Sequence, residues 1–73
     1  MRLTRHAKNR LRWIRRVEPD LTEVDLLAAL DRGVGIGHDV RNNRLVSVEV
    51  RGVQLVLVVD EIEQMVITMW REE

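Results

Sequence analysis

Hydrophobic residues near the start of the chain repeat at helical spacing. They are Leu3, Ala7, Leu11 and Ile14, which fall on one side of a helix at about 100° per residue. The pattern predicts a helix from about Thr4 to Val17 whose apolar side faces the core. Pro19 ends this helix, because proline disfavours helical geometry in the residue before it.

A second helix is predicted between this proline and Gly33. Asp20 fits the N-cap position, and Glu23 three residues later completes a pair that resembles a capping box. The helix then runs to about Arg32, where Gly33 ends it. Apolar residues cover much of its circumference, so we expect it to be buried on two sides or to dock a partner.

Beyond Gly33 the pattern changes from helical to β. Segments 45–50 and 53–59 are dense in β-branched residues and flank a two-residue turn at Arg51 and Gly52, which predicts a hairpin. The loop length fixes the register of the two strands. On the face toward the helices, it pairs Val50 with Val53, Val48 with Leu55 and Val46 with Leu57. The other face is expected to be half exposed and pairs Glu49 with Gln54, Ser47 with Val56 and Leu45 with Val58.

Two further strands complete the predicted sheet. Asn42 and Asn43 indicate a tight turn after a strand near Val34 to Val40, since asparagine tolerates positive φ. Residues 60–64 turn the chain into a last strand from Met65 to Trp70. The predicted architecture is α+β, a single domain over residues 1–73 in which two N-terminal helices pack on a four-stranded antiparallel sheet.

The basic residues are unevenly distributed in a chain whose formal net charge is zero. Seven of the twelve Lys and Arg residues lie within positions 1–17, a segment that contains no acid. A protein that binds nucleic acid on its own usually carries excess positive charge. Neutrality therefore restricts any such site to a small footprint.

Composition excludes several classes of site. The absence of cysteine rules out disulfides and thiolate zinc sites and suits a reducing cytoplasm. The longest apolar runs, 26–30 and 55–59, are too short for a membrane span, which needs roughly 20 residues. His38 and Asp39 lack a third ligand at usable spacing, so we interpret them as a turn and expect no metal. The glycines do not have the spacing of a phosphate loop, and no cofactor is expected.

His6 and Arg10 are the strongest candidates for chemistry. They lie four residues apart on the predicted helix, so their Cβ atoms are within about 6 Å and a phosphate fits between the side chains. Cleavage of RNA by its own 2′-hydroxyl needs a group that exchanges a proton near neutral pH and a cation at the phosphate. The alternative is structural, with His6 bonded to backbone and Arg10 paired with a sheet acid such as Glu49.

The other basic residues of the first helix form a candidate RNA-binding face. They are Arg5, Lys8, Arg12, Arg15 and Arg16, on the side away from the apolar stripe. The same face would equally suit solvent or an acidic partner protein. Trp13 and Trp70, the only aromatic residues, are either platforms for a base or anchors in the core, and the need of a small chain for bulk favours the core.

Several short motifs together resemble a known group of proteins. The opening RHAKNRLRWIRR, an acid-capped second helix, a valine-rich hairpin and the closing MVITMW are similar to a domain-of-unknown-function family of small bacterial and archaeal proteins, grouped near the RelE-like and BrnT-like toxins. The resemblance implies a RelE-like fold and an mRNA-cleaving ribonuclease held in check by an antitoxin. The positions that match the family motif are His6, Arg10 and Thr68. The chain departs from active toxins in being neutral and in lacking a C-terminal cluster of Arg, Lys and Tyr.

Two hypotheses for function follow. In the first, a toxin-like domain grips RNA with its basic helix, His6 serves as acid or base, Arg10 steadies the phosphate and Thr68 orients one of them. In the second, the chain is a non-catalytic interaction module, a homodimer that binds its twin or an acidic, antitoxin-like protein. That module uses the half-exposed face of the sheet or the apolar second helix.

Overall fold

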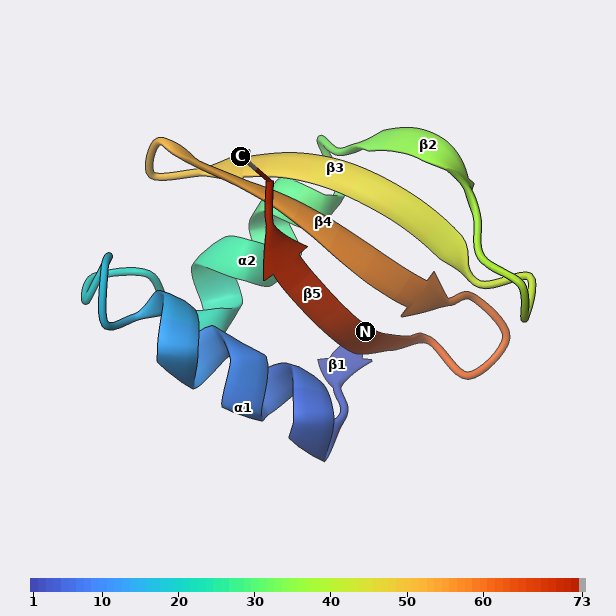
Figure 1. Ribbon diagram of the computed structural model, residues 1–73, viewed down its shortest axis with the longest axis horizontal. Helices are drawn as coiled ribbons and strands as arrows, with labels where there is room; N and C mark the ends of the chain where they lie inside the picture. The colour runs from blue at the N-terminus through green and yellow to red at the C-terminus, as the bar shows by residue number, and fades with distance from the viewer. Residues whose placement is uncertain (73) are drawn as a thin grey trace.

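The computed structural model describes residues 1–72 and contains two helices and five strands. In chain order they are β1 (Arg2–Leu3), α1 (Arg5–Ile14), α2 (Glu23–Leu30), β2 (Val34–His38), β3 (Arg44–Val50), β4 (Val53–Asp60) and β5 (Met65–Arg71). The strands form one sheet in the order β1-β5-β4-β3-β2. Both helices lie on the same side of this sheet, with α1 alongside β5 (Figure 1). Neither described helix has the length and apolar character of a membrane span.

The predicted arrangement of two N-terminal helices on four antiparallel strands is wrong, because a fifth strand precedes the first helix. Leu3 fits the helical stripe by its spacing from Ala7, but it pairs with Val66 in β5 instead. This pairing is parallel, so the sheet is mixed. In chain order the two helices lie between β1 and β2. A strand of two residues has no periodicity of its own, and only its distant partner defines it.

α1 is shorter than the predicted segment. Its N-cap is Thr4, whose hydroxyl accepts a hydrogen bond from the N–H of Ala7. Ala7 and Leu11 are buried against the sheet. Residues 15–17 do not continue the helix, since Arg16 and Val17 donate to the carbonyls three residues back and form a tighter turn.

The start of α2 differs from the expectation that Asp20 and Glu23 cap it. The observed N-cap is Thr22, which exchanges hydrogen bonds with Asp25 in a complete capping box. Asp20 instead belongs to the turn that links the helices. The helix ends at Leu30, before the predicted Arg32, and a Cβ at Gly33 would overlap the side chain of Val46. Gly33 therefore allows the chain to pass close to the sheet.

Asp25 connects α2 to the turn between β3 and β4. Its carboxylate accepts hydrogen bonds from the N–H of Thr22 and from Arg51 Nε, each at 3.2 Å. The Thr22 backbone bond, followed by the Arg51 contact, lowers the pKa of Asp25 below its usual value near 3.8. These hydrogen bonds stabilise the folded state fully at a pH above the usual pKa of the Asp25 carboxyl group. This stabilisation is lost as the pH falls through the lower pKa that Asp25 has in the folded state.

Removing this carboxylate should reduce the acid sensitivity of the fold. We expect the free energy of unfolding to fall less between pH 7 and about pH 2.5 in Asp25→Asn than in the wild type, as measured by urea denaturation. Arg51→Gln should give an intermediate result, because it keeps the larger contribution from Thr22. Equal acid sensitivity in Asp25→Asn and the wild type would contradict this assignment.

The central hairpin has the register predicted from the length of its loop. All six predicted pairs between β3 and β4 are present, from Val50 opposite Val53 to Leu45 opposite Val58. Arg51 and Gly52 have φ of 50° and 80°, the positive values that a type I′ turn needs. The prediction is confirmed because a two-residue turn leaves the strands little choice of register.

The sheet has two distinct faces. The inner face carries the core beneath the helices, including Val46, Leu55 and Leu57. The outer face is defined here by the side chains that alternate with these, Leu45, Ser47, Val56, Val58, Thr68 and Trp70. Val56 and Val58 are buried there by their cross-strand neighbours and do not join the main core.

The strand β2 forms one edge of the sheet. It ends at His38 rather than at the predicted Val40, and all five of its residues are exposed. The turn that follows contains Asn42 at φ 64°, which agrees with the tolerance of asparagine for positive φ. A hydrogen bond from the backbone N–H of Asn43 holds the pKa of Asp39 below its usual value, and this carboxylate orders the turn.

Candidate nucleic-acid interface

The basic residues of α1 and of the turn after it are exposed. They are Arg5, Lys8, Arg10, Arg12, Arg15 and Arg16. Within residues 1–72 the ion pairs are Arg44 with Glu61 at 3.8 Å and Arg51 with Asp25 at 3.2 Å. The alternative in which Arg10 pairs with Glu49 is therefore not observed. The positive charges of this segment face solvent without a neutralising carboxylate from the described part of the chain.

Both tryptophans are exposed, contrary to the expectation that they anchor the core. Trp13 on α1 is 61% exposed and Trp70 on β5 is 43% exposed. The guanidinium of Arg16 lies 4.3 Å from the centre of the Trp13 ring, a cation–π contact. The core obtains its bulk from leucine, valine and methionine side chains instead.

The two tryptophans share one hollow, which we call the indole hollow. Its lining residues come from α1, the turn after it and the end of β5, and they are Arg10, Trp13, Ile14, Val17, Met69, Trp70 and Arg71. The volume is about 230 Å³. Every charged side chain in this lining is an arginine. The hollow therefore combines aromatic rings with positive charge.

The edge of the sheet explains how residues so far apart in sequence meet. β1 pairs only with Met65 and Val66, so the rest of β5 is an edge along which α1 lies. The hydroxyl of Thr4 donates to the carbonyl of Ile67 at 2.7 Å and fixes the start of α1 beside this edge. The C-terminal half of α1 then reaches Met69 and Trp70.

The three predicted catalytic residues are not collected in one hollow. Arg10 lines the indole hollow, whereas Thr68 lines a second hollow of about 390 Å³ on the outer face. Trp70 lines both, so the two hollows are neighbours. His6 is exposed on α1 and lines neither of them. Its side chain makes no hydrogen bond within residues 1–72.

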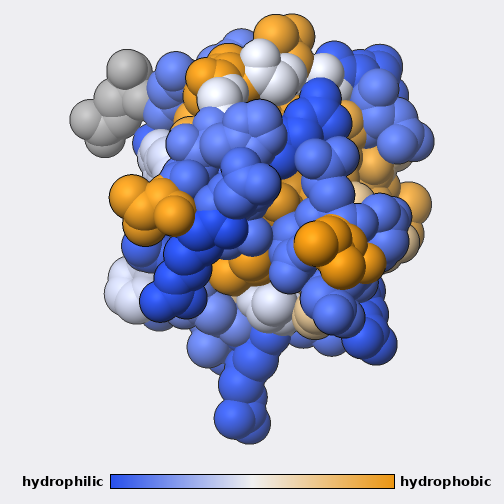
Figure 2. Space-filling model, turned by 90° about the vertical axis from the view of Figure 1, so that its right-hand side faces the viewer, coloured by the Kyte–Doolittle hydropathy of each residue, from blue (hydrophilic) through white to orange (hydrophobic). Residues whose placement is uncertain are grey.

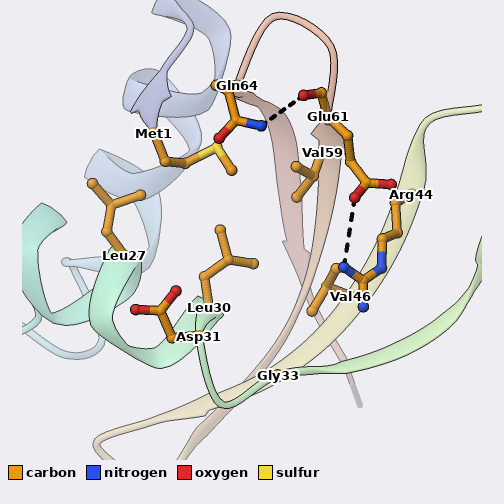
Figure 3. Close-up of a pocket in the computed structure, with 10 residues that line it drawn as sticks. All are labelled: Met1, Leu27, Leu30, Asp31, Gly33, Arg44, Val46, Val59, Glu61 and Gln64. Carbon is orange, nitrogen blue, oxygen red and sulfur yellow. Dashed lines mark hydrogen bonds and ion pairs between the residues drawn. The ribbon is translucent and has the colours of Figure 1, made fainter.

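A hollow larger than these two lies elsewhere, on the inner face beyond the end of α2. It measures about 620 Å³, and Figure 3 shows Leu27 and Leu30 on one side of it and the Arg44–Glu61 ion pair on the other. Arg44 is neutralised by Glu61, and no histidine lines the hollow. We therefore assign it no chemistry.

The loops at one end of the molecule offer no continuous apolar surface. Figure 2 shows this end, where the β2–β3 and β4–β5 loops lie, as mostly hydrophilic with separate hydrophobic spots. Among the described residues no three His, Cys, Asp or Glu side chains form a group that could hold a metal. His38 and Asp39 lie where β2 ends and the turn begins, as the sequence predicted.

Sequence reasoning missed the contribution of β5 to this interface. The sequence places Trp13 on the basic helix as a candidate for RNA binding, favours the core for both tryptophans and assigns no role to Arg71. Alternation along β5 puts Trp70 on the outer face with Thr68, and only the position of β5 at the sheet edge beside α1 brings Trp70 to the indole hollow. The chain matches no protein-family model, and comparisons with curated proteins and with solved structures found no match.

Proposed function

We propose that this domain binds RNA through α1 and the turn that follows it. The observation that carries the proposal is a set of six exposed basic side chains on one short segment, none of them paired with a carboxylate of residues 1–72. Phosphates neutralise such a set, and the release of their counterions supplies the binding free energy.

The size of the segment agrees with a small footprint. α1 has ten residues and is therefore roughly 15 Å long. Adjacent phosphates of an extended single strand lie farther apart than the roughly 3.4 Å rise of a duplex strand, so the helix spans at most about four phosphates. A footprint of this size is compatible with a net charge of zero, because the acids lie on other segments.

The neighbouring tryptophans favour RNA over an acidic protein partner. Trp13 and Trp70 lie next to the basic residues, and nucleobases stack on exposed indoles. An acidic protein would use the same charges without needing both rings. Cleavage by His6 and Arg10, and with it the toxin-like role that the resemblance implies, remains a prediction.

The test is a titration of a labelled single-stranded RNA with the protein, followed by fluorescence anisotropy at several salt concentrations. Three or four phosphate contacts predict a slope of log K against log salt of about −2 to −3. Affinity should therefore fall about 20- to 60-fold between 50 mM and 200 mM salt. A poly-glutamate peptide of similar charge should bind more weakly.

Absence of RNA binding at 50 mM salt, or preferential binding of the acidic peptide, would contradict the proposal. The same samples run on a denaturing gel show whether bound RNA is cut. If it is, His6→Ala and Arg10→Ala should lose the cleavage while they keep the thermal unfolding profile of the wild type. If the bound RNA is not cut, the function is limited to binding.

A further inference from the structure

The indole hollow has features that a purely electrostatic site does not need. We infer that it takes an unpaired nucleobase, so that the domain selects single-stranded RNA over duplex. This inference rests on the proposed function and goes further, since phosphate contacts alone do not distinguish paired from unpaired bases. Three observations carry it.

The first observation is the exposure of both indoles. A chain without Phe or Tyr would be expected to use its two tryptophans for the core, where large apolar surfaces stabilise most. Instead Trp13 and Trp70 line one hollow at the surface. Exposed aromatic rings next to basic residues are the stacking platforms that proteins use for single strands.

The second observation is the charge around the rings. Arg10 and Arg71 line the hollow from opposite elements, and Arg16 lies over the ring of Trp13 at 4.3 Å. None of the lining residues is acidic. A base stacked in the hollow therefore has cations close to the phosphates on either side of it.

The third observation is the size and position of the hollow. Its volume of about 230 Å³ lies below the roughly 300–1,000 Å³ of pockets that enclose a whole small ligand. It suits one unit of a polymer whose neighbours lie outside. Bases in a duplex are stacked and paired, so their flat faces do not reach such a recess, whereas an unpaired base can turn into it.

The experiment uses the intrinsic fluorescence of the full chain. Trp13 and Trp70 are the only tryptophans and both line the indole hollow, so the emission reports on that hollow and, through Trp70, on the neighbouring hollow of the outer face. Three probes are compared at 50 mM salt: an unstructured RNA 12-mer, the same strand in a duplex, and polyphosphate, which has charge without bases. We expect the single strand to quench the emission and to bind about tenfold or more tightly than the duplex, and polyphosphate to bind without quenching.

Paired substitutions separate stacking from bulk. Trp70→Leu keeps an apolar side chain without a ring and should weaken single-strand binding about 5- to 150-fold. Trp70→Phe should retain most of the affinity, and neither variant should alter the binding of polyphosphate. Ile62→Ala serves as the control, since Ile62 is 92% exposed and lies outside the hollow. Thermal unfolding followed by circular dichroism checks that each variant is folded.

The outcomes distinguish the two proposals. Equal affinity for single strand, duplex and polyphosphate, without quenching, would overturn the stacking inference and leave electrostatic RNA binding intact. Equal losses in Trp70→Leu and Trp70→Phe would likewise overturn it. Failure of the wild type to bind any of the three probes at low salt would overturn the proposed function itself.

Discussion

Leu57→Ala should destabilise the fold by about 2–5 kcal/mol, because it opens a cavity in the core between the centre of the sheet and the helices. Leu57 is fully buried on β4, and its cross-strand neighbours on either side are Val46 and Met69. A domain has only about 5–15 kcal/mol of stability in total, and small domains lie toward the lower end. The substitution should therefore lower the Tm by roughly 8–40 °C, as measured by circular dichroism.

Ile62→Ala is the matched control for this loss. It also shortens an aliphatic side chain, but Ile62 is 92% exposed in the loop between β4 and β5. Its effect should remain within about 0.5 kcal/mol. Similar losses in the two variants would mean that β4 does not hold the centre of the core.

Arg5→Gln combined with Arg12→Gln should weaken RNA binding about 50-fold at 50 mM salt, since two phosphate contacts are lost. Arg5 and Arg12 lie two turns apart on one side of α1 and take part in no ion pair among residues 1–72. Glutamine has a similar helix propensity, so the helix should persist. The slope of log K against log salt should become shallower by about 1.4.

The control changes the net charge by the same amount elsewhere. Arg32 and Arg41 are exposed arginines outside α1, and the double variant Arg32→Gln with Arg41→Gln removes them. We expect it to keep the affinity of the wild type within about twofold, apart from a small long-range effect. If both double variants lose the same affinity, binding depends on overall charge and not on α1.

Local patterns predicted the central hairpin and the buried side of α1 correctly. The register of β3 and β4 follows from the loop at Arg51 and Gly52, and Ala7 and Leu11 are buried as their spacing indicates. The largest error lies where distant segments meet. β1 exists only through its pairing with β5, so no window of sequence reveals it. The cap of α2 was misplaced because two overlapping sequences, from Asp20 and from Thr22, fit the capping pattern.

The candidate site, too, was predicted only where it depends on a local pattern. The helical period identified the basic side of α1, since charge on a helix face is a local pattern. The indole hollow depends on the contact between α1 and β5, which brings Trp13 to Trp70. Side-chain exposure also depends on the complete fold, and the rule that tryptophan is mostly buried failed for both residues.

We expect the parallel pairing of β1 with β5 to form late when the molecule folds. Leu3 meets Val66, so this contact closes a loop that contains most of the chain, whereas the hairpin of β3 and β4 closes a loop of two residues. Long loops are costly to close, so contacts of this kind form late. During synthesis residues 2–14 precede β5, so we expect them to dock only after β5 has been made. The segment that carries the charges should therefore become a rigid surface only after β5 has left the ribosome.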